Sequence, residues 1–256
     1  MFSLLGPLQV MDSAREIPVQ AAKQRAILAV LLLRPNRVVT FDLLTSELWA
    51  AGPPATAKTS LQTYVYRLRQ AIAPLVARGV ELQTQGSGYL LTVPDGVVDL
   101  RTFEDLTVGG AEALAAGDPG GAAKCLREAL AMWRGPLLAD VDVELVRQER
   151  RRLEEICLNT YEMCLEAELR LGRGIHVVPE LEQFIAAHPF RETLWIMVMR
   201  ALHSGGRRME ALAAYRRLYR ILDEELGIRP NAEVQLLYQD ILHGHPASPL
   251  LSSGQR

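Results

Sequence analysis

Residues 56–73 read TAKTSLQTYVYRLRQAIA, and the spacing of their apolar side chains predicts an amphipathic α-helix. These side chains recur at steps of four, three and four, which places them on one face; they are Leu61, Val65, Leu68 and Ile72. The opposite face carries hydroxyls, amides and guanidiniums, and no Asp or Glu occurs between residues 48 and 80. Solvated helices usually mix charges of both signs, so a helix without acids favours a polyanionic partner.

The charge distribution divides the chain into a basic front and an acidic remainder. Residues 1–98 hold nine Lys or Arg against six Asp or Glu, a net charge of +3, which leaves −5 for the other residues. Hydrophobic residues make up 49% of the chain and charged residues 23%, the balance of a globular protein and not of a disordered one. We therefore expect two modules with different partners.

Several classes of protein are not expected from this sequence. The longest apolar run is far shorter than the roughly 20 residues of a membrane span, and the N-terminal stretch has no basic start typical of a signal peptide. The cysteines, Cys125, Cys157 and Cys164, have no zinc-site spacing, and no phosphate-binding loop or HExxH motif is present. We expect a cytoplasmic, nucleoid-associated protein that is not an enzyme and holds no cofactor or metal.

The first hundred residues predict strands, three helices and a hairpin, in that order. Phe2–Val10 and Glu16–Val19 are candidate strands, and the expected helices cover residues 20–33, 41–50 and 56–73. Thr40 is expected to cap the second helix. Alternating runs at 80–84 and 89–93 flank a Gly-rich turn and predict a β-hairpin. This is the order of a winged helix-turn-helix, whose last helix enters the major groove of DNA.

Three blocks of this region carry a family resemblance. AAKQRAILAVLLLRPNRVVTFDLLTSELW (21–49), PPATAKTSLQTYVYRLRQAI (53–72) and GSGYLLTV (86–93) resemble the DNA-binding domain of the Streptomyces antibiotic regulatory proteins. That domain is itself similar to the winged helix of OmpR-type response regulators, which often carry an arginine where this chain has Leu90. The SLQTYVYRLR core and the GSGY turn are the most specific parts, because amphipathicity alone does not produce them.

The resemblance implies DNA contacts for thirteen residues. Base edges would be read by Thr59, Gln62, Thr63 and Arg67, whose side chains can pair with guanine, adenine or the thymine methyl group at about 1–3 kcal/mol per bidentate pair. Phosphates would be held by Ser60, Tyr66 and Arg69 on the same helix, and further backbone contacts would come from Lys23, Arg25 and Thr40 on the preceding ones. Lys58 is a further expected DNA contact. The wing would approach the minor groove at Ser87 and Leu90.

After a short turn at residues 94–96, everything from residue 98 to residue 242 is predicted to be helical. The expected helices cover 100–116, 119–133, 143–171, 179–187, 191–204, 209–226 and 232–242. Gly172-Arg173 and Gly206-Arg207 lie 34 positions apart, and at that offset Leu181 falls on Tyr215 and Ile185 on Tyr219. A period of about 34 with paired helices is typical of tetratricopeptide repeats, which stack into superhelices that bind proteins.

This half is similar to the bacterial transcriptional activation domain that accompanies the winged helix in the same family. The matching blocks are VDLRTFEDL, LREALAMWRGPLLAD, HPFRETLW, GRRMEALAAYRRL and EELGIRPNAEVQLLYQDIL. We expect a mostly α chain with a winged helix-turn-helix over 1–94, a tetratricopeptide-like domain over 98–242 and a flexible tail over 243–256.

The function implied is that of a pathway-specific transcriptional activator of an antibiotic gene cluster. It would bind direct repeats in double-stranded promoter DNA, self-associate there and recruit RNA polymerase holoenzyme. The alternative is a tetratricopeptide-type protein adaptor whose winged helix does not read DNA. The basic run at 147–152, RQERRR, is interpreted as a solvated helix face with neighbouring acids, with a second DNA contact as the alternative.

Overall fold

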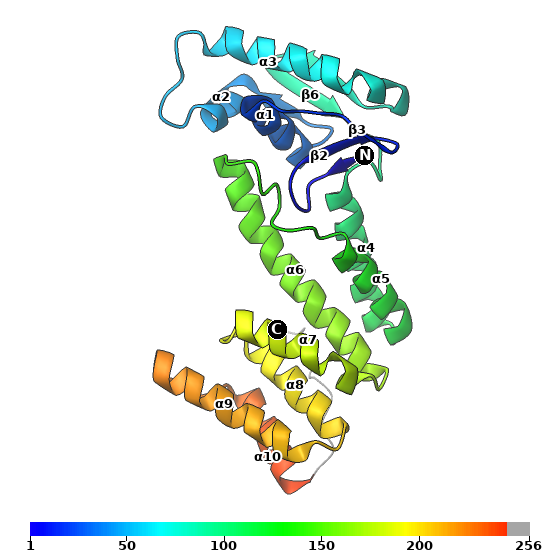
Figure 1. Ribbon diagram of the computed structural model, residues 1–256, viewed down its shortest axis with the longest axis vertical. Coiled ribbons are helices and arrows are strands. Elements are labelled where there is room, and N and C mark those ends of the chain that lie inside the picture. The colour runs from blue at the N-terminus through cyan, green and yellow to red at the C-terminus, as the bar shows by residue number, and fades with distance from the viewer. Residues whose placement is uncertain (245–256) are drawn as a thin grey trace. The chain divides into compact units, whose positions relative to one another are not determined.

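The computed structural model describes residues 1–244 (Figure 1). It contains two compact units: the first comprises residues 1–108 and 127–159, and the second residues 109–126 and the chain from residue 160 on. The prediction of a mostly helical chain that begins with a winged helix-turn-helix is confirmed. The flexible tail predicted for 243–256 lies outside the described residues, except for its first two.

Six strands and ten α-helices are formed by the described residues. The strands are β1 (Phe2–Ser3), β2 (Gln9–Asp12), β3 (Arg15–Glu16), β4 (Val38–Thr40), β5 (Glu81–Gln85) and β6 (Gly88–Thr92). The helices are α1 (Ala22–Leu33), α2 (Phe41–Leu48), α3 (Ala57–Ile72), the 3-10 helix η1 (Ala73–Arg78), α4 (Asp99–Ala115), α5 (Pro119–Ala131), α6 (Glu144–Arg170), α7 (Gly174–Ala187), α8 (Glu192–Ser204), α9 (Arg208–Leu226) and α10 (Ala232–His243). None of these helices is long and apolar enough to cross a membrane.

The N-terminal residues form an antiparallel sheet of order β1-β2-β3, so the prediction of a single strand over 2–10 is wrong. The chain turns at Gly6, whose φ of +142° disfavours residues with a side chain. Before the turn, the buried Leu4 and Leu5 donate their backbone N–H groups to the carboxylate of Asp99, at 2.7 and 3.2 Å, and not to a neighbouring strand. A distant side chain therefore replaces the strand partner that a local pattern suggests.

One other strand prediction needs correction, and one strand was missed. β3 ends at Glu16 and does not continue to Val19, because Pro18 has no N–H to donate to a ladder. β4 was not predicted; it is only three residues long and pairs antiparallel with β6 so that Thr40 lies opposite Gly88. The order β4-β6-β5 makes β6 the central strand of the wing sheet.

The helix-turn-helix follows the sequence prediction closely. The side chain of Thr40 accepts a hydrogen bond from Leu43 N (3.3 Å) and caps α2, as expected. The apolar face predicted for α3 is confirmed, since all four of its residues are buried to within 1% exposure; these are Leu61, Val65, Leu68 and Ile72. The helix ends at Ile72, and the 3-10 helix η1 begins at Ala73 with Pro74 in its first turn. Packing on α1 and α2 thus fixes which face of α3 is left to solvent.

In the second unit, each helix from α7 to α10 packs antiparallel against the next one. These helices enclose an apolar core of their own around Trp195. α7 begins at Gly174, five residues before the predicted start at Pro179, which lies inside the helix. Proline is usually expected in the first turn of a helix. The helical turn before Pro179 forms because Val177 and Val178 are buried in the core. Tertiary packing therefore overrides the preference of proline for the first turn.

The period of 34 residues is visible in the backbone of this unit. Gly172 and Gly206 both adopt left-handed φ angles, +73° and +75°. The next residue of each pair closes the turn in the same way, because Arg173 N donates to Glu168 O (2.9 Å) and Arg207 N donates to Leu202 O (2.8 Å). The correspondence weakens along the helices: Ile185 is buried whereas Tyr219, 34 residues later, is 36% exposed.

Candidate nucleic-acid interface

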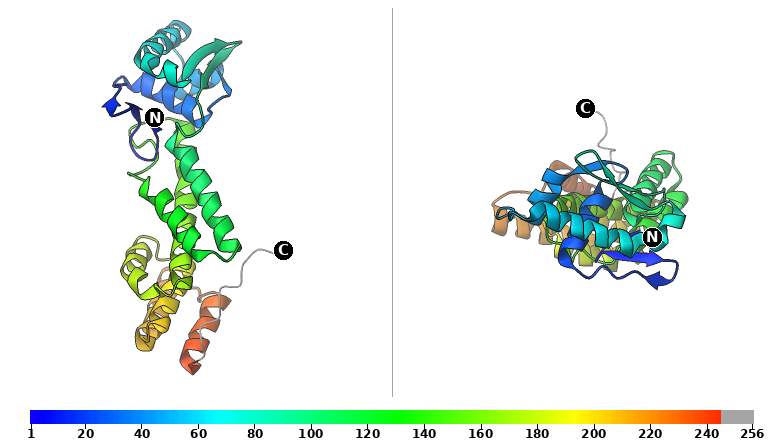
Figure 2. Two further views of the ribbon diagram at one scale, coloured as in Figure 1. Left: turned by 90° about the vertical axis from the view of Figure 1, so that its right-hand side faces the viewer. Right: turned by 90° about the horizontal axis from the view of Figure 1, so that it is seen from above.

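The solvent-exposed face of α3 consists of residues that can hydrogen-bond to DNA. Six of the predicted contact residues are exposed on it, namely Lys58, Thr59, Gln62, Thr63, Tyr66 and Arg67, and Ser60 is half-buried beside them. Tyr66 is 62% exposed, which is far more than an aromatic ring needs if it serves only to pack the helix. Figure 2 shows α3 and the β5–β6 hairpin on one surface of the first unit. The structure therefore brings these side chains together in one accessible row.

The two cations at the ends of this row are available for a ligand. Lys58 and Arg67 are exposed, and neither makes an ion pair or side-chain hydrogen bond with any of the described residues. Thr63, by contrast, donates its hydroxyl to the carbonyl of Thr59 (3.0 Å) in the same helix. Its methyl group and its oxygen lone pairs remain on the exposed face.

Arg69 connects α3 to the wing. Its Nε donates to the backbone oxygen of Leu82 (2.7 Å) and its Nη2 donates to the hydroxyl of Thr84 (2.8 Å), both on β5. The guanidinium also lies 5.9 Å from the centre of the Tyr89 ring on β6. Two of the donors of Arg69 are therefore bonded within the protein, and they fix the hairpin against the helix.

We expect Arg69→Ala to lower the free energy of unfolding by about 1–2 kcal/mol, because the carbonyl of Leu82 loses its side-chain donor. Arg67→Ala, on the exposed face two residues earlier, should stay within about 0.5 kcal/mol of wild type. Denaturant unfolding of both variants provides the comparison. Equal stability of the two variants would contradict the bracing role of Arg69.

The wing turn places Ser87 at its exposed tip and Leu90 further along β6. The backbone oxygen of Ser87 accepts from Phe41 N (2.9 Å), which joins the turn to the start of α2. Leu90 is half-buried and pairs with Val38 of β4 and Gln83 of β5. Of these two predicted contact residues, only Ser87 is therefore at the end of the hairpin.

Gly88 of the GSGY motif is required by close packing of strands. A Cβ atom added there would come 2.2 Å from the carbonyl oxygen of Val39 on β4. We expect Gly88→Ala to lower the free energy of unfolding by about 2–3 kcal/mol, because the clash is with backbone and not with a flexible side chain. Gly109→Ala is the matched control, since its added methyl group meets open space in α4 and should be neutral or slightly stabilising. Similar unfolding curves for the two variants would contradict this assignment.

The two cations predicted on α1 are engaged within the first unit. The Lys23 ammonium donates to Leu48 O and lies 5.4 Å from the centre of the Trp49 ring. The Arg25 guanidinium pairs with Asp140 and donates to Val19 O (2.9 Å). The chain separation between Arg25 and Asp140 is 115 residues, so no local pattern could have indicated this pairing.

Most of the basic run at 147–152 is also paired within the protein. Arg147 contacts the carboxylates of Asp142 (2.5 Å) and Glu144 (2.9 Å). Arg150 donates to three backbone carbonyls between residues 137 and 141. Arg152 contacts Glu149 and Glu104. These contacts favour the interpretation of this run as a paired helix face over a second DNA contact.

Two residues outside the predicted set contribute to the architecture of this surface. Glu47 on α2 accepts a hydrogen bond from Leu145 N (2.9 Å), in the first turn of α6, and so ties the helix-turn-helix to that helix. Arg37, just before β4, is exposed and makes no ion pair with the described residues. Arg37 is therefore a further candidate for a phosphate contact next to the wing sheet. From the sequence, only the lack of a neighbouring acid could have indicated this role.

Comparison with known proteins identifies both halves of the chain. Residues 17–91 match the model described as "Transcriptional regulatory protein, C terminal", and residues 98–242 match the "Bacterial transcriptional activator domain". The Regulatory protein DnrI of Streptomyces peucetius is 38% identical over 253 residues, which cover 95% of this chain and 92% of that protein. The chain belongs to the Streptomyces antibiotic regulatory protein family of transcriptional regulators.

Longer members of this family share the same two parts. The Transcriptional regulatory protein EmbR of Mycobacterium tuberculosis is 37% identical over 96% of the chain, which spans 64% of EmbR. The chain spans 25% of the Regulatory protein AfsR of Streptomyces coelicolor, at 37% identity. The solved structure of EmbR, in complex with a low affinity phosphopeptide, superimposes with a TM-score of 0.90 at 36% identity and covers 97% of this chain and 66% of that one.

Proposed function

We propose that this family member is a sequence-specific activator that binds direct repeats in promoter DNA through α3. One observation carries the proposal: α3 exposes a continuous row of hydrogen-bonding and cationic side chains, without a carboxylate, on a winged helix-turn-helix. A helix of this kind docks in the major groove. There its guanidinium and amide groups meet base edges, and phosphates supply most of the affinity.

The accessible side chains suggest a division of roles. Thr59, Gln62, Thr63 and Arg67 would read bases, while Lys58, Ser60 and Tyr66 would hold phosphates. Thr40, Ser87 and Leu90 keep the backbone and wing contacts that the family resemblance implies. For Lys23, Arg25 and Arg69, bonds within the protein favour a positioning role, in which they hold the elements that present α3.

The helical part of the chain would supply activation. Paired helices of this kind mostly bind other proteins, and we propose RNA polymerase and a neighbouring protomer as the partners. Binding to direct repeats requires more than one protomer in the same orientation, which a contact between neighbours would stabilise. Membership of a family that includes DnrI supports control of a secondary-metabolite gene cluster, in the cytoplasm at the nucleoid.

Salt dependence of DNA binding tests the first step of this proposal. Anisotropy of a labelled random duplex should show that affinity falls by orders of magnitude between about 50 and 200 mM salt, because phosphate contacts release counterions. Lys58→Ala should weaken binding to all duplexes alike and make the salt slope shallower by about one unit. If the affinity of the wild type for DNA did not change with salt concentration, the alternative would be favoured, a protein adaptor that does not bind DNA.

A further inference from the structure

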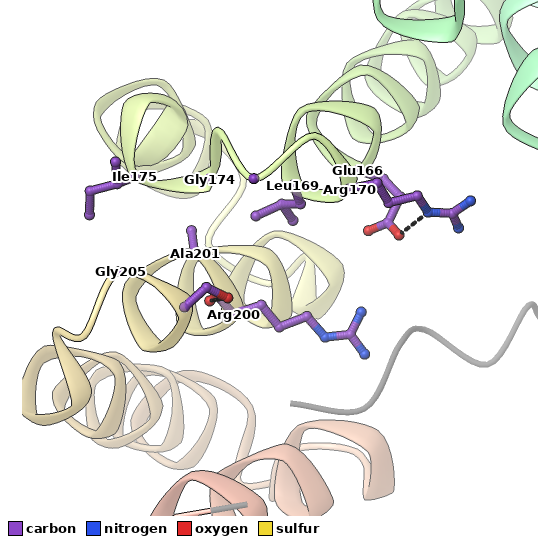
Figure 3. Close-up of a pocket in the computed structure, with 10 residues that line it drawn as sticks. Glu166, Leu169, Arg170, Gly174, Ile175, Arg200, Ala201 and Gly205 are labelled. Carbon is purple, nitrogen blue, oxygen red and sulfur yellow. Dashed lines mark hydrogen bonds and ion pairs between the residues drawn. The ribbon is translucent and has the colours of Figure 1, made fainter. Parts of the chain in front are cut away.

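A pocket in the second unit lies where the end of α6, the start of α7 and the end of α8 meet (Figure 3). Its volume is about 230 Å³. Glycines allow the helices to come this close: a Cβ atom at Gly174 would lie 2.7 Å from Leu169 Cδ2, and one at Gly205 would lie 3.0 Å from Ile175 Cδ1. The pocket has an apolar part formed by Leu169, Ile175 and Ala201.

Arg200 gives the pocket a buried cation that lacks a hydrogen-bond acceptor. Its side chain is only 12% exposed, and its Nε is fully buried with no acceptor among the described residues. The carboxylate of Glu233 lies 4.0 Å from Nη2, which is beyond hydrogen-bonding distance. A guanidinium stays protonated, so a carboxylate in the pocket that accepts hydrogen bonds from the Nη atoms of Arg200 would offset part of the cost of burying this charge.

Arg170 adds a second guanidinium at the same end of the pocket. In Figure 3 the side chains of Arg170 and Arg200 extend toward one end, whereas Ile175 lies at the other. Arg170 Nε donates to Glu166 (2.9 Å), and Nη1 donates to the backbone oxygen of Leu114 (3.3 Å). The lining therefore carries two cations and one carboxylate, and the carboxylate of Glu233 is a second acid 4.0 Å from Arg200 Nη2.

We propose that this pocket binds a small molecule with one carboxylate and a short apolar body. The carboxylate would accept hydrogen bonds from Arg200 and Arg170, whose planar forks match its geometry. The apolar body would contact Leu169, Ile175 and Ala201. A volume of about 230 Å³ is below the range of roughly 300–1,000 Å³ for drug-sized ligands, so the ligand is small. This assignment does not depend on the proposed DNA binding.

Titration of the full chain with hexanoate, followed by methyl NMR, tests the proposal. Hexanoate should shift the methyl signals of Leu169, Ile175 and Ala201 saturably, whereas hexanamide, which has the same body without the charge, should not. Arg200→Met should weaken hexanoate binding by about tenfold or more, the loss expected for a charge-assisted bond. Arg220→Met, an exposed arginine on α9, is the matched control and should bind as wild type does.

A second variant separates anion binding from a purely structural role of Arg200. Glu166→Gln keeps an acceptor for Arg170 but removes the carboxylate from the lining, so it should strengthen hexanoate binding by about threefold or more, a pairwise charge effect at a partly buried site. If Arg200 had only a structural role, Glu166→Gln would not strengthen hexanoate binding. The proposal is overturned if hexanoate fails to shift these methyl signals, if hexanamide binds equally well, or if Arg200→Met retains wild-type affinity.

Discussion

Replacing Arg67 with alanine is expected to weaken binding to the preferred DNA site by about 5- to 150-fold, the loss of about 1–3 kcal/mol that accompanies removal of a bidentate contact to guanine. Arg67 is exposed on α3, and it has no ion-pair partner among the described residues, so its removal should not disturb the fold. The variant should also tolerate other bases at the position that Arg67 reads. Anisotropy with the preferred duplex and with single-base variants of it measures both effects.

The matched control for this experiment is Lys58→Ala at the other end of the exposed row. A lysine that holds phosphates fixes the position of the protein on DNA without reading its sequence. Its loss should therefore weaken binding to all duplexes by a similar factor. The two variants therefore differ in specificity as well as in affinity. If Arg67→Ala weakened preferred and random duplexes equally, a base-reading role for Arg67 would be ruled out.

The largest expected effect on stability comes from Asp99→Ala, which should lower the free energy of unfolding by about 2–4 kcal/mol. Asp99 is 7% exposed, and its carboxylate accepts the backbone N–H groups of the buried Leu4 and Leu5. Truncation would leave both donors unsatisfied where water does not reach them. Asp95→Ala, at an exposed position four residues earlier, should change stability by less than about 0.5 kcal/mol. Denaturant unfolding of both variants checks the difference.

The same carboxyl group should make this stability difference depend on pH. Burial raises the pKa of Asp99 above its ordinary value of 3.8, while bonds from Leu4 and Leu5 and the Arg134 charge oppose the increase. The folded state thus binds the proton more tightly than the unfolded state. The stabilisation from protonation is fully present below pH 3.8 and is lost as pH rises through the raised pKa. The difference in the free energy of unfolding between wild type and Asp99→Ala should therefore become smaller as pH rises from 3.8 through the raised pKa. A difference that grows with pH would contradict the raised pKa.

The features that sequence predicted correctly are those with a strong local period or a local stop signal. The apolar steps at Leu61, Val65 and Leu68 fix the buried face of α3 because a helix repeats every 3.6 residues. The hairpin around Gly86 follows from a Gly-rich turn between alternating runs. Thr40 caps α2 through its own side chain, an interaction confined to three residues.

Most of the errors arose where a distant partner decides the local conformation. Residues 2–10 form two strands and a turn because Asp99, far along the chain, binds the backbone of Leu4 and Leu5. β4 exists because β6 lies beside it. α7 starts early because the core buries Val177 and Val178 ahead of Pro179. None of these partners can be read from a window of local sequence.

The candidate site shows the same division. The exposed row on α3 could be predicted because helical geometry assigns each residue to a face. The bonds of Arg69 to Leu82 and of Arg25 to Asp140 could not, because a basic residue at a helix surface has the same sequence pattern whether it is free or paired. Charge composition thus suggested a polyanionic partner, and only the structure distinguishes the cations that stay exposed from those bonded within the protein.

The most direct test of the central claim is selection of bound fragments from random duplex DNA with the wild-type chain, followed by sequencing. We expect enrichment of one motif, present as two copies in the same orientation at a fixed spacing. Protection of both copies by footprinting would show that more than one protomer binds. Failure to enrich any motif, under salt conditions in which the protein stays folded, would contradict sequence-specific binding and leave the protein adaptor as the better account.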